Sequence, residues 1–362
     1  DNSTFSTSLG YLDQTGMTIY SDYKRYNFRL NTSYKKGRFS FSETLGLTHK
    51  DKTPTTAFNI ALPTLPIYDE QGRFTSGGPD YYITPEDGKA QNKIAPLHYT
   101  DQFNKVTDLI GSLNAQLDIW GGLKYKLSLS GNYSNKHNYT HTPEYYTKWN
   151  SDGTPDKDYG NTRNSVSETR GEEFTYTIDN LLTYNKTFNR HSIDALLGTS
   201  WMREYYRYMT NSTINDLGGT DITGFQNEDG KISAGDSNAA LLSFFARVNY
   251  DYDNKYLLSL SIRRDESSKF HKDNRVGYFP SVSAGWNVHQ EKWFQNPVMS
   301  KLKIRASYGE LGANFLNPYN FDAIAYGPIP YTVGGERYVT GRAAYLKSKD
   351  LKWETAKTTD IG

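Results

Sequence analysis

Acidic and amide side chains follow one another in NEDGKISAGD, residues 227–236, in an order that partly matches a calcium-binding EF-hand loop. If Gly230 is the sixth residue of such a loop, Asn227, Asp229 and Asp236 fall at its third, fifth and twelfth positions. The first position, which also requires an oxygen ligand, is occupied by a phenylalanine. We therefore favour an ordinary Asp-Gly turn over a calcium site, and we expect no metal or other cofactor.

The other polar residues predict no catalytic site. The chain contains no cysteine, and its seven histidines show no HExxH or comparable metal-binding spacing. The motifs GxSxG, GxGxxG and Walker A are also absent from the sequence. Glu172 and Glu173 are adjacent, so on a strand they point to opposite faces and cannot flank one glycosidic bond. We expect the protein not to be an enzyme.

Aromatic residues in two connecting segments, GPDYYITPED and PEYYTKWN, are better candidates for a binding site. Their ring faces can stack on sugars while neighbouring Asp and Asn side chains bond to hydroxyl groups. The alternative is that these rings pack the loops or touch a partner protein. The candidate substrate-binding residues are Tyr81, Tyr82, Tyr145, Tyr146 and Trp149.

The composition narrows the class of protein. The 362 residues carry a net charge of +1, so no basic block is available to neutralise nucleic-acid phosphates. Aromatic residues make up 15% of the chain, with 30 Tyr, which suits strands and the boundary between water and an apolar phase. No run approaches the roughly 20 apolar residues that a spanning helix needs.

Alternation of apolar and polar residues dominates the elements that carry these loops. In KLKIRASYG, the even positions from Leu302 to Tyr308 are apolar, and Lys301, Lys303 and Arg305 lie opposite. We expect the even positions to face lipid and the odd ones to face a lumen. The predicted strands are 4–11, 23–34, 38–49, 103–120, 122–134, 171–187, 190–206, 240–252, 255–264, 277–289, 301–310 and 352–362.

Two polar residues fall on the apolar side of this alternation. They are Glu43, within RFSFSETLGL, and Asn180, within FTYTIDNLLTY. We expect each to mark either a β-bulge or a position close to a membrane interface, where the cost of a polar group is small.

Connections alternate between short and long along the chain. Short ones such as KKG and Asp253-Asn254 are hairpin turns, whereas 50–102, 135–170 and 311–351 are long and rich in Gly, Pro, Asn and Tyr. This rhythm is typical of an all-β, antiparallel up-and-down transmembrane barrel with short periplasmic turns and long extracellular loops. A soluble β-sandwich or lectin-like domain is the alternative.

Four segments in order resemble the SusC/RagA family of TonB-dependent outer-membrane transporters. They are KYLLSLSIRRDESSKF, GYFPSVSAGWNV, LKIRASYGELG and LKWETAKTTDIG, all within 255–362. Glu266 and Ala313 depart from the family pattern at loop ends. The resemblance implies that residues 1–362 are part of a single barrel domain, with about twelve of about 22 strands and without the plug domain.

The resemblance also implies a function and a location. The protein would import an oligosaccharide or an oligopeptide across the outer membrane of a Gram-negative cell. Its partners would be a SusD-like surface lipoprotein, the TonB complex acting through a plug and Ton box, and outer-membrane lipid, with no nucleic acid. A passive porin and a secreted soluble glycan-binding protein remain as alternatives, and the choice between glycan and peptide stays open.

Overall fold

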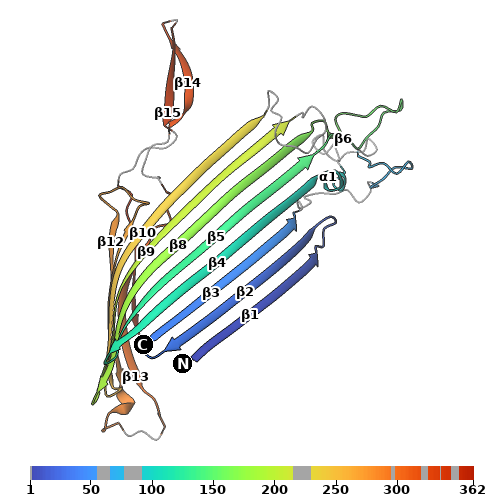
Figure 1. Ribbon diagram of the computed structural model, residues 1–362. Helices are drawn as coiled ribbons and strands as arrows, with labels where there is room; N and C mark the ends of the chain where they lie inside the picture. The colour runs from blue at the N-terminus through green and yellow to red at the C-terminus, as the bar shows by residue number, and fades with distance from the viewer. Residues whose placement is uncertain are drawn as a thin grey trace.

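Twelve antiparallel strands form one curved sheet in the computed structural model (Figure 1). The structure describes residues 2–54, 66–76, 92–214, 230–294, 298–318, 325–334, 336–343 and 350–362. The sheet order is β1-β2-β3-β4-β5-β8-β9-β10-β11-β12-β13-β16, so each strand pairs with the next sheet strand along the chain. This is the predicted up-and-down meander. The sheet does not close, and β1 and β16 are its two edges.

The twelve sheet strands match the predicted list in number and order. In sheet order they are β1 Asn2–Thr15, β2 Asp22–Lys36, β3 Phe39–Thr53, β4 Asp101–Trp120, β5 Leu123–Thr142, β8 Ser165–Phe188, β9 His191–Ile214, β10 Lys231–Tyr252, β11 Tyr256–Ser267, β12 Val276–Asn287, β13 Lys303–Ala313 and β16 Glu354–Ile361.

Several strands run further toward the long loops than the sequence predicted. β8 and β9 each have 24 residues, well beyond the 9–11 that cross a bilayer. The extra residues had been predicted as loop because they are rich in Thr, Tyr and Asn. They pair instead, as His141 does with Val166, because Thr and Tyr favour strands and the ladder continues without interruption.

Short elements inside the connections were not predicted. Ala95–Tyr99 forms helix α1, and Val288–Gln290 forms the 3₁₀ helix η1. Two small hairpins pair β6 with β7 and β14 with β15. Their bounds are β6 Tyr145–Tyr146, β7 Gly160–Asn161, β14 Ala325–Val333 and β15 Glu336–Ala343. In the described part of the chain, no helix is long and apolar enough to cross a membrane.

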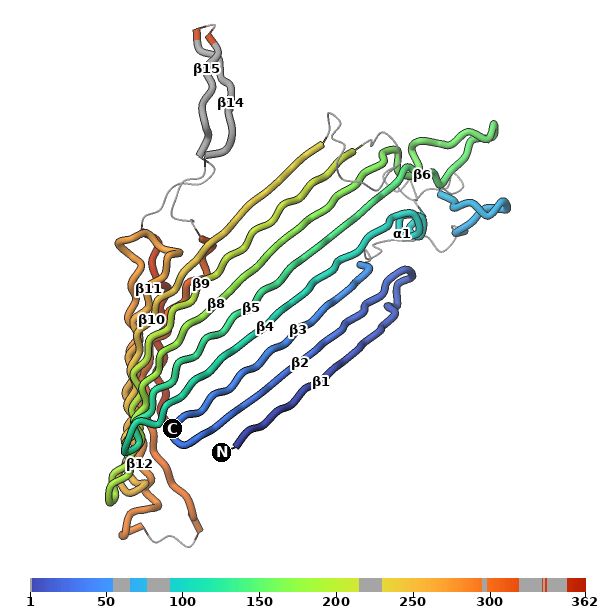
Figure 2. The backbone as a smooth tube through the Cα atoms, viewed as in Figure 1, coloured from blue at the N-terminus to red at the C-terminus, as the bar shows by residue number. Residues whose placement is uncertain are grey.

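Tight turns close the strands at one end of the sheet, opposite the end that carries α1 and β6 (Figure 2). Asn189, Asp253 and Asn254 have φ angles of 51°, 55° and 54°, which Asn and Asp tolerate better than most residues. At Gly122, with φ of 96°, a Cβ would lie 1.9 Å from the Asn185 carbonyl oxygen. These residue types therefore set the turns that the sequence predicted.

Cross-strand pairing sorts side chains onto two faces. Leu47, for example, pairs with Phe28 on one side and Leu109 on the other, all on the apolar face. Glu43 and Asn180 lie on this face too, but the register runs through both without a shift, so the bulge interpretation was wrong. Asn180 accepts a 2.6 Å hydrogen bond from the Tyr125 hydroxyl, which partly satisfies its amide.

Buried aromatic packing fixes the upper part of β11 and β12. Phe270, which follows β11, is 1% exposed and packs on Trp353, which also contacts Phe279. The Trp353 indole donates a hydrogen bond to the Arg275 carbonyl at 2.9 Å. A Cβ at Gly312 would lie 1.9 Å from the Phe279 ring, so the glycine makes room for it. Residues of the four segments that resemble the SusC/RagA family thus meet in one small buried core.

Candidate functional site

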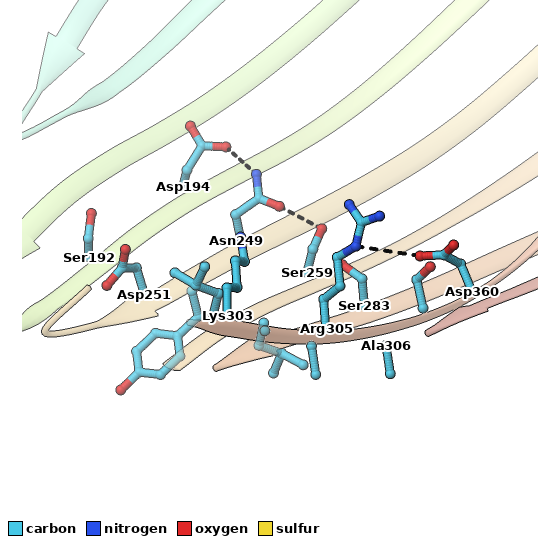
Figure 3. A pocket seen from close by; sticks show the side chains of 16 residues that line it. Ser192, Asp194, Asn249, Asp251, Ser259, Ser283, Lys303, Arg305, Ala306 and Asp360 are labelled. Carbon is cyan, nitrogen blue, oxygen red and sulfur yellow. Dashed lines mark hydrogen bonds and ion pairs between the residues drawn. The ribbon is translucent and has the colours of Figure 1, made fainter. Parts of the chain in front are cut away.

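A row of polar side chains crosses six neighbouring strands on the polar face. The row consists of paired positions, one on each strand: Asp194, Asn249, Ser259, Ser283, Ser307 and Asp360. Each belongs to the polar half of its own strand's alternation, and the register alone brings them together. The row is the floor of a hollow of about 460 Å³ (Figure 3). Because this hollow spans β9 to β16, the polar face is concave here.

Hydrogen bonds within the row leave much of its polarity available. The Asn249 amide donates to Asp194 at 3.2 Å, and the Ser259 hydroxyl donates to Asn249 at 2.7 Å (Figure 3). Arg305 and Asp360 form an ion pair at 3.6 Å, with side chains 64% and 55% exposed. Such an arrangement can hydrogen-bond to hydroxyl, amide or charged groups passing over it.

A second polar cluster lies further along the same face, on β3 to β8. The Lys50 ammonium contacts Asp108 at 2.7 Å, and the Ser134 hydroxyl donates to the same carboxylate at 2.7 Å. Lys136 and Glu173 pair at 2.9 Å. The polar face is therefore wettable along its width, as the lining of an aqueous lumen must be.

Two long connections pack against each other at the opposite end from the tight turns. Tyr99, at the end of α1, stacks on Tyr145 of β6, with ring centroids 4.8 Å apart and planes at 16°. The Ser76 and Thr147 hydroxyls are hydrogen-bonded at 2.7 Å and buried. We call residues 66–76, 92–100 and 143–164 the loop body.

Asn92 fastens the first of these connections. Its amide nitrogen donates to the carbonyls of Ile67 and Thr75, both at 2.9 Å. Its amide oxygen accepts from the backbone N–H groups of Ile94 and Ala95, which begin helix α1. Asn92 is 6% exposed, so these bonds replace water completely. One side chain thereby sets the shape of residues 66–76 relative to α1.

Of the predicted substrate-binding residues, three lie in the loop body. Tyr145 has one ring face on Tyr99, and burial, followed by the nearby Tyr99, raises the pKa of its hydroxyl. The Tyr146 hydroxyl donates to Glu144, and this bond raises its pKa. The Arg73 guanidinium lies 4.6 Å from the centre of the Trp149 ring. Tyr81 and Tyr82 lie outside the described residues.

The calcium-like segment is described only in part. Asn227 and Asp229 lie outside the described residues, and Asp236 is inside β10, where it pairs with Arg207. Among the residues that the structure describes, no group of three or more His, Cys, Asp or Glu side chains could hold a metal ion.

Sequence reasoning missed the residues that give the site its shape. Asp194 and Asp360 are far apart in the chain, and only the register places them in one row. The sequence alternation showed that each belongs to the polar half of its strand. It did not show that the two residues align in one row across the sheet. Arg73 and Asn92 carried no signal, because single polar residues in loops are common.

Comparisons with known proteins agree with this architecture. The family described as "TonB dependent receptor-like, beta-barrel" matches residues 57–362. The TonB-dependent receptor P3 of Formosa agariphila is 27% identical over the whole chain, and the TonB-dependent receptor SusC of Bacteroides thetaiotaomicron is 25% identical. The RagAB peptide transporter structure superposes with a TM-score of 0.79 over 100% of this chain, at 19% identity.

The match covers only a part of each relative. The chain spans 36% of the length of receptor P3, 38% of SusC and 40% of the RagAB chain. The twelve strands therefore correspond to one portion of a larger barrel.

Proposed function

Because the chain belongs to the TonB-dependent receptor β-barrel family, we propose that it forms part of the wall of an importer for an oligosaccharide or an oligopeptide. Family membership also places the protein in the outer membrane, so its apolar face meets lipid and its tight turns face the periplasm. The observation that carries the proposal is the continuous polar row on the concave face, directly behind a continuous apolar face.

The residues of the polar row solvate a passing cargo and do not react with it. The polar row offers carboxylate, amide and hydroxyl groups, so a hydrated cargo exchanges water for weak contacts without being trapped. Energy would come from TonB acting on a plug domain, and a SusD-like surface lipoprotein would deliver the cargo to the long-loop end. Both partners are part of the proposal.

The loop body is the proposed first contact for cargo. Trp149 is partly exposed and lies against Arg73, and Tyr146 is hydrogen-bonded to Glu144. Rings fixed in this way lose little freedom when a sugar ring or a peptide side chain packs on them. Tyr145 can offer only the ring face that Tyr99 leaves open. Tyr81 and Tyr82 are proposed as further contacts from the same connection as Tyr99.

Uptake by whole cells tests the proposal. Cells carrying the full-length transporter would be given fluorescent oligosaccharides from partly hydrolysed starch and, separately, labelled peptides from digested casein. We expect uptake of one pool, and we expect it to stop when the proton gradient that powers TonB is collapsed. Uptake that continues without the gradient would identify a passive porin instead.

A substitution in the loop body tests whether this region contacts the cargo. Trp149→Ala should raise the cargo concentration for half-maximal uptake several-fold, by losing one stacking surface. Trp120→Ala is the matched control, because Trp120 ends β4 beside a tight turn at the opposite end of the sheet. Equal effects of the two substitutions would remove the loop body from the proposed path.

A further inference from the structure

The apolar face between β10 and β13 is hollowed in two adjoining places. The first, of about 480 Å³, lies toward the tight turns, and the second, of about 410 Å³, lies further along the same strands. We call the two together the apolar slot. Its apolar-face residues are Ala246, Val248, Tyr250, Tyr256, Leu258, Leu260, Ile262, Pro280, Val282, Ala284, Trp286, Ile304, Ala306 and Tyr308.

Small residues make the floor of the slot. Ala284 pairs with Ala306 across β12 and β13, and with Leu258 on β11. One pair nearer the turns, Trp286 faces Ile304, and one pair further away, Val282 faces Tyr308. Two alanines between larger side chains therefore leave a depression, and both line the hollow nearer the turns.

The rings around the slot have their polar atoms bonded elsewhere. Glu291 accepts hydrogen bonds from the Tyr256 hydroxyl at 2.6 Å and from the Trp286 indole at 3.2 Å. At the other end, the Tyr308 hydroxyl donates to Glu310 at 2.5 Å. These bonds fix the rings and leave mainly carbon surface for an occupant of the slot.

A basic side chain lies at the periplasmic end. Lys292 is exposed on the segment that joins β12 to β13, between Glu291 and Trp293, whose side chains both contact Trp286 at this end of the slot. An elongated apolar slot that ends beside a cation matches an acyl chain ending in an anionic head group.

We propose that the apolar slot holds one acyl chain of a phospholipid from the periplasmic leaflet, with the head-group phosphate beside Lys292. The slot is continuous with the apolar face that meets membrane lipid, so lipid is the occupant available to it. This proposal rests on the outer-membrane location and not on the cargo, so either proposal can fail without the other.

Photocrosslinking tests the proposal. The full-length transporter would be reconstituted with a phosphatidylethanolamine that carries a diazirine on its acyl chain, irradiated and digested, and the adducts mapped by mass spectrometry. We expect adducts to concentrate on peptides containing residues 256–260, 282–286 and 304–308. Adducts spread evenly over apolar-face peptides would show ordinary surrounding lipid only and would overturn the proposal.

A larger side chain in the floor of the apolar slot provides the control. Ala306→Leu should reduce slot adducts at least threefold, whereas Ala115→Leu, on the apolar face of β4, should leave them unchanged. Insertion of each variant would be verified by its heat-dependent migration on gels, and Ala284→Leu would replace any variant that fails to insert. Unchanged adducts in an inserted floor variant, or loss of adducts with crosslinking between two copies of the chain, would also overturn the proposal.

Discussion

The two faces of the sheet between β9 and β13 are made from adjacent residues and meet opposite surroundings. Arg305 and Ser307 line the polar hollow, while Ala306 and Tyr308 line the apolar slot directly behind it. Successive side chains of a strand point to opposite faces, so one strand can serve both. The comparison shows that one layer of backbone is enough to separate a wet surface from a lipid-facing one.

The faces also differ in what holds them together. On the polar face, ion pairs such as Arg247 with Asp194 at 3.8 Å are long and exposed to water. Around the slot on the apolar face, the hydroxyls of Tyr256 and Tyr308 are hydrogen-bonded to Glu291 and Glu310 at its two ends. Substitutions should therefore be tolerated on the polar face and resisted on the apolar face.

The largest contrast is expected between positions 304 and 305. The chain has no cysteine. A single Cys introduced at position 304 or 305 of the full-length protein therefore carries the only nitroxide label within these 362 residues. Label 304 should be accessible to oxygen dissolved in lipid, and label 305 to a water-soluble relaxing agent. If label 305 shows the greater lipid accessibility, the assignment of the two faces is reversed.

A charge on the apolar face should have the largest energetic effect. Val282→Arg is expected to destabilise the inserted barrel by about 2–4 kcal/mol, because the guanidinium must enter hydrocarbon. Ser283→Arg, one residue along on the polar face, is the control and should change stability by less than about 1 kcal/mol. Unfolding by guanidinium in phospholipid vesicles measures both, and equal losses would contradict the comparison.

Glu291→Gln should have an intermediate effect, a shift of a few degrees in the unfolding temperature. The Tyr256 hydroxyl, and after it Trp286 and Lys255, lower the pKa of Glu291 by favouring its charged form. A lowered carboxyl pKa stabilises the fold above the unfolded value of about 4.3, and that contribution is lost as pH falls through the folded pKa.

The pH dependence separates this charge from simple packing. The wild-type protein should lose more stability than Glu291→Gln when the pH is lowered from neutrality to below the carboxyl range. Thermal unfolding followed by gel migration at each pH provides the measurement. Parallel curves for the two proteins would mean that the Glu291 charge does not hold the rings of the slot.

Arg305→Gln should have the smallest effect. The Arg305–Asp360 pair is exposed and 3.6 Å long, so its loss should cost less than about 1 kcal/mol. Its matched control is Lys50→Gln, which removes the 2.7 Å contact to Asp108 on the same face. A loss above about 2 kcal/mol for Arg305→Gln would show that the polar face carries stability after all.

Much of this architecture was readable before the structure. The alternation in KLKIRASYG placed Ile304 on the face of the apolar residues and Arg305 on the opposite face. The short turns predicted the meander. Strand ends near the long loops were less predictable, since Thr- and Tyr-rich segments suit both loops and paired strands. The hairpin of β14 and β15 was missed inside a connection predicted as loop.

The loop body was the least predictable region. Tyr145, Tyr146 and Trp149 were identified as aromatic loop residues, but their partners Tyr99 and Arg73 belong to another connection. Contacts between loops depend on where strands deliver them, and no local pattern encodes that. Of the two alternatives for Glu43 and Asn180, the bulge was wrong and a position near a membrane interface stays a prediction, because a polar residue on an apolar face can be accommodated without disturbing the register.

The sequence by itself determined the class of fold, the face of nearly every strand residue and the turns, because each follows from a period of two or from the φ preferences of Gly, Asn and Asp. The tertiary structure decided which polar residues meet in one row, where alanines open a slot, and which aromatic rings have their polar atoms bonded. These depend on register between strands far apart in the chain, and register is settled only when all the hydrogen-bonded ladders form together.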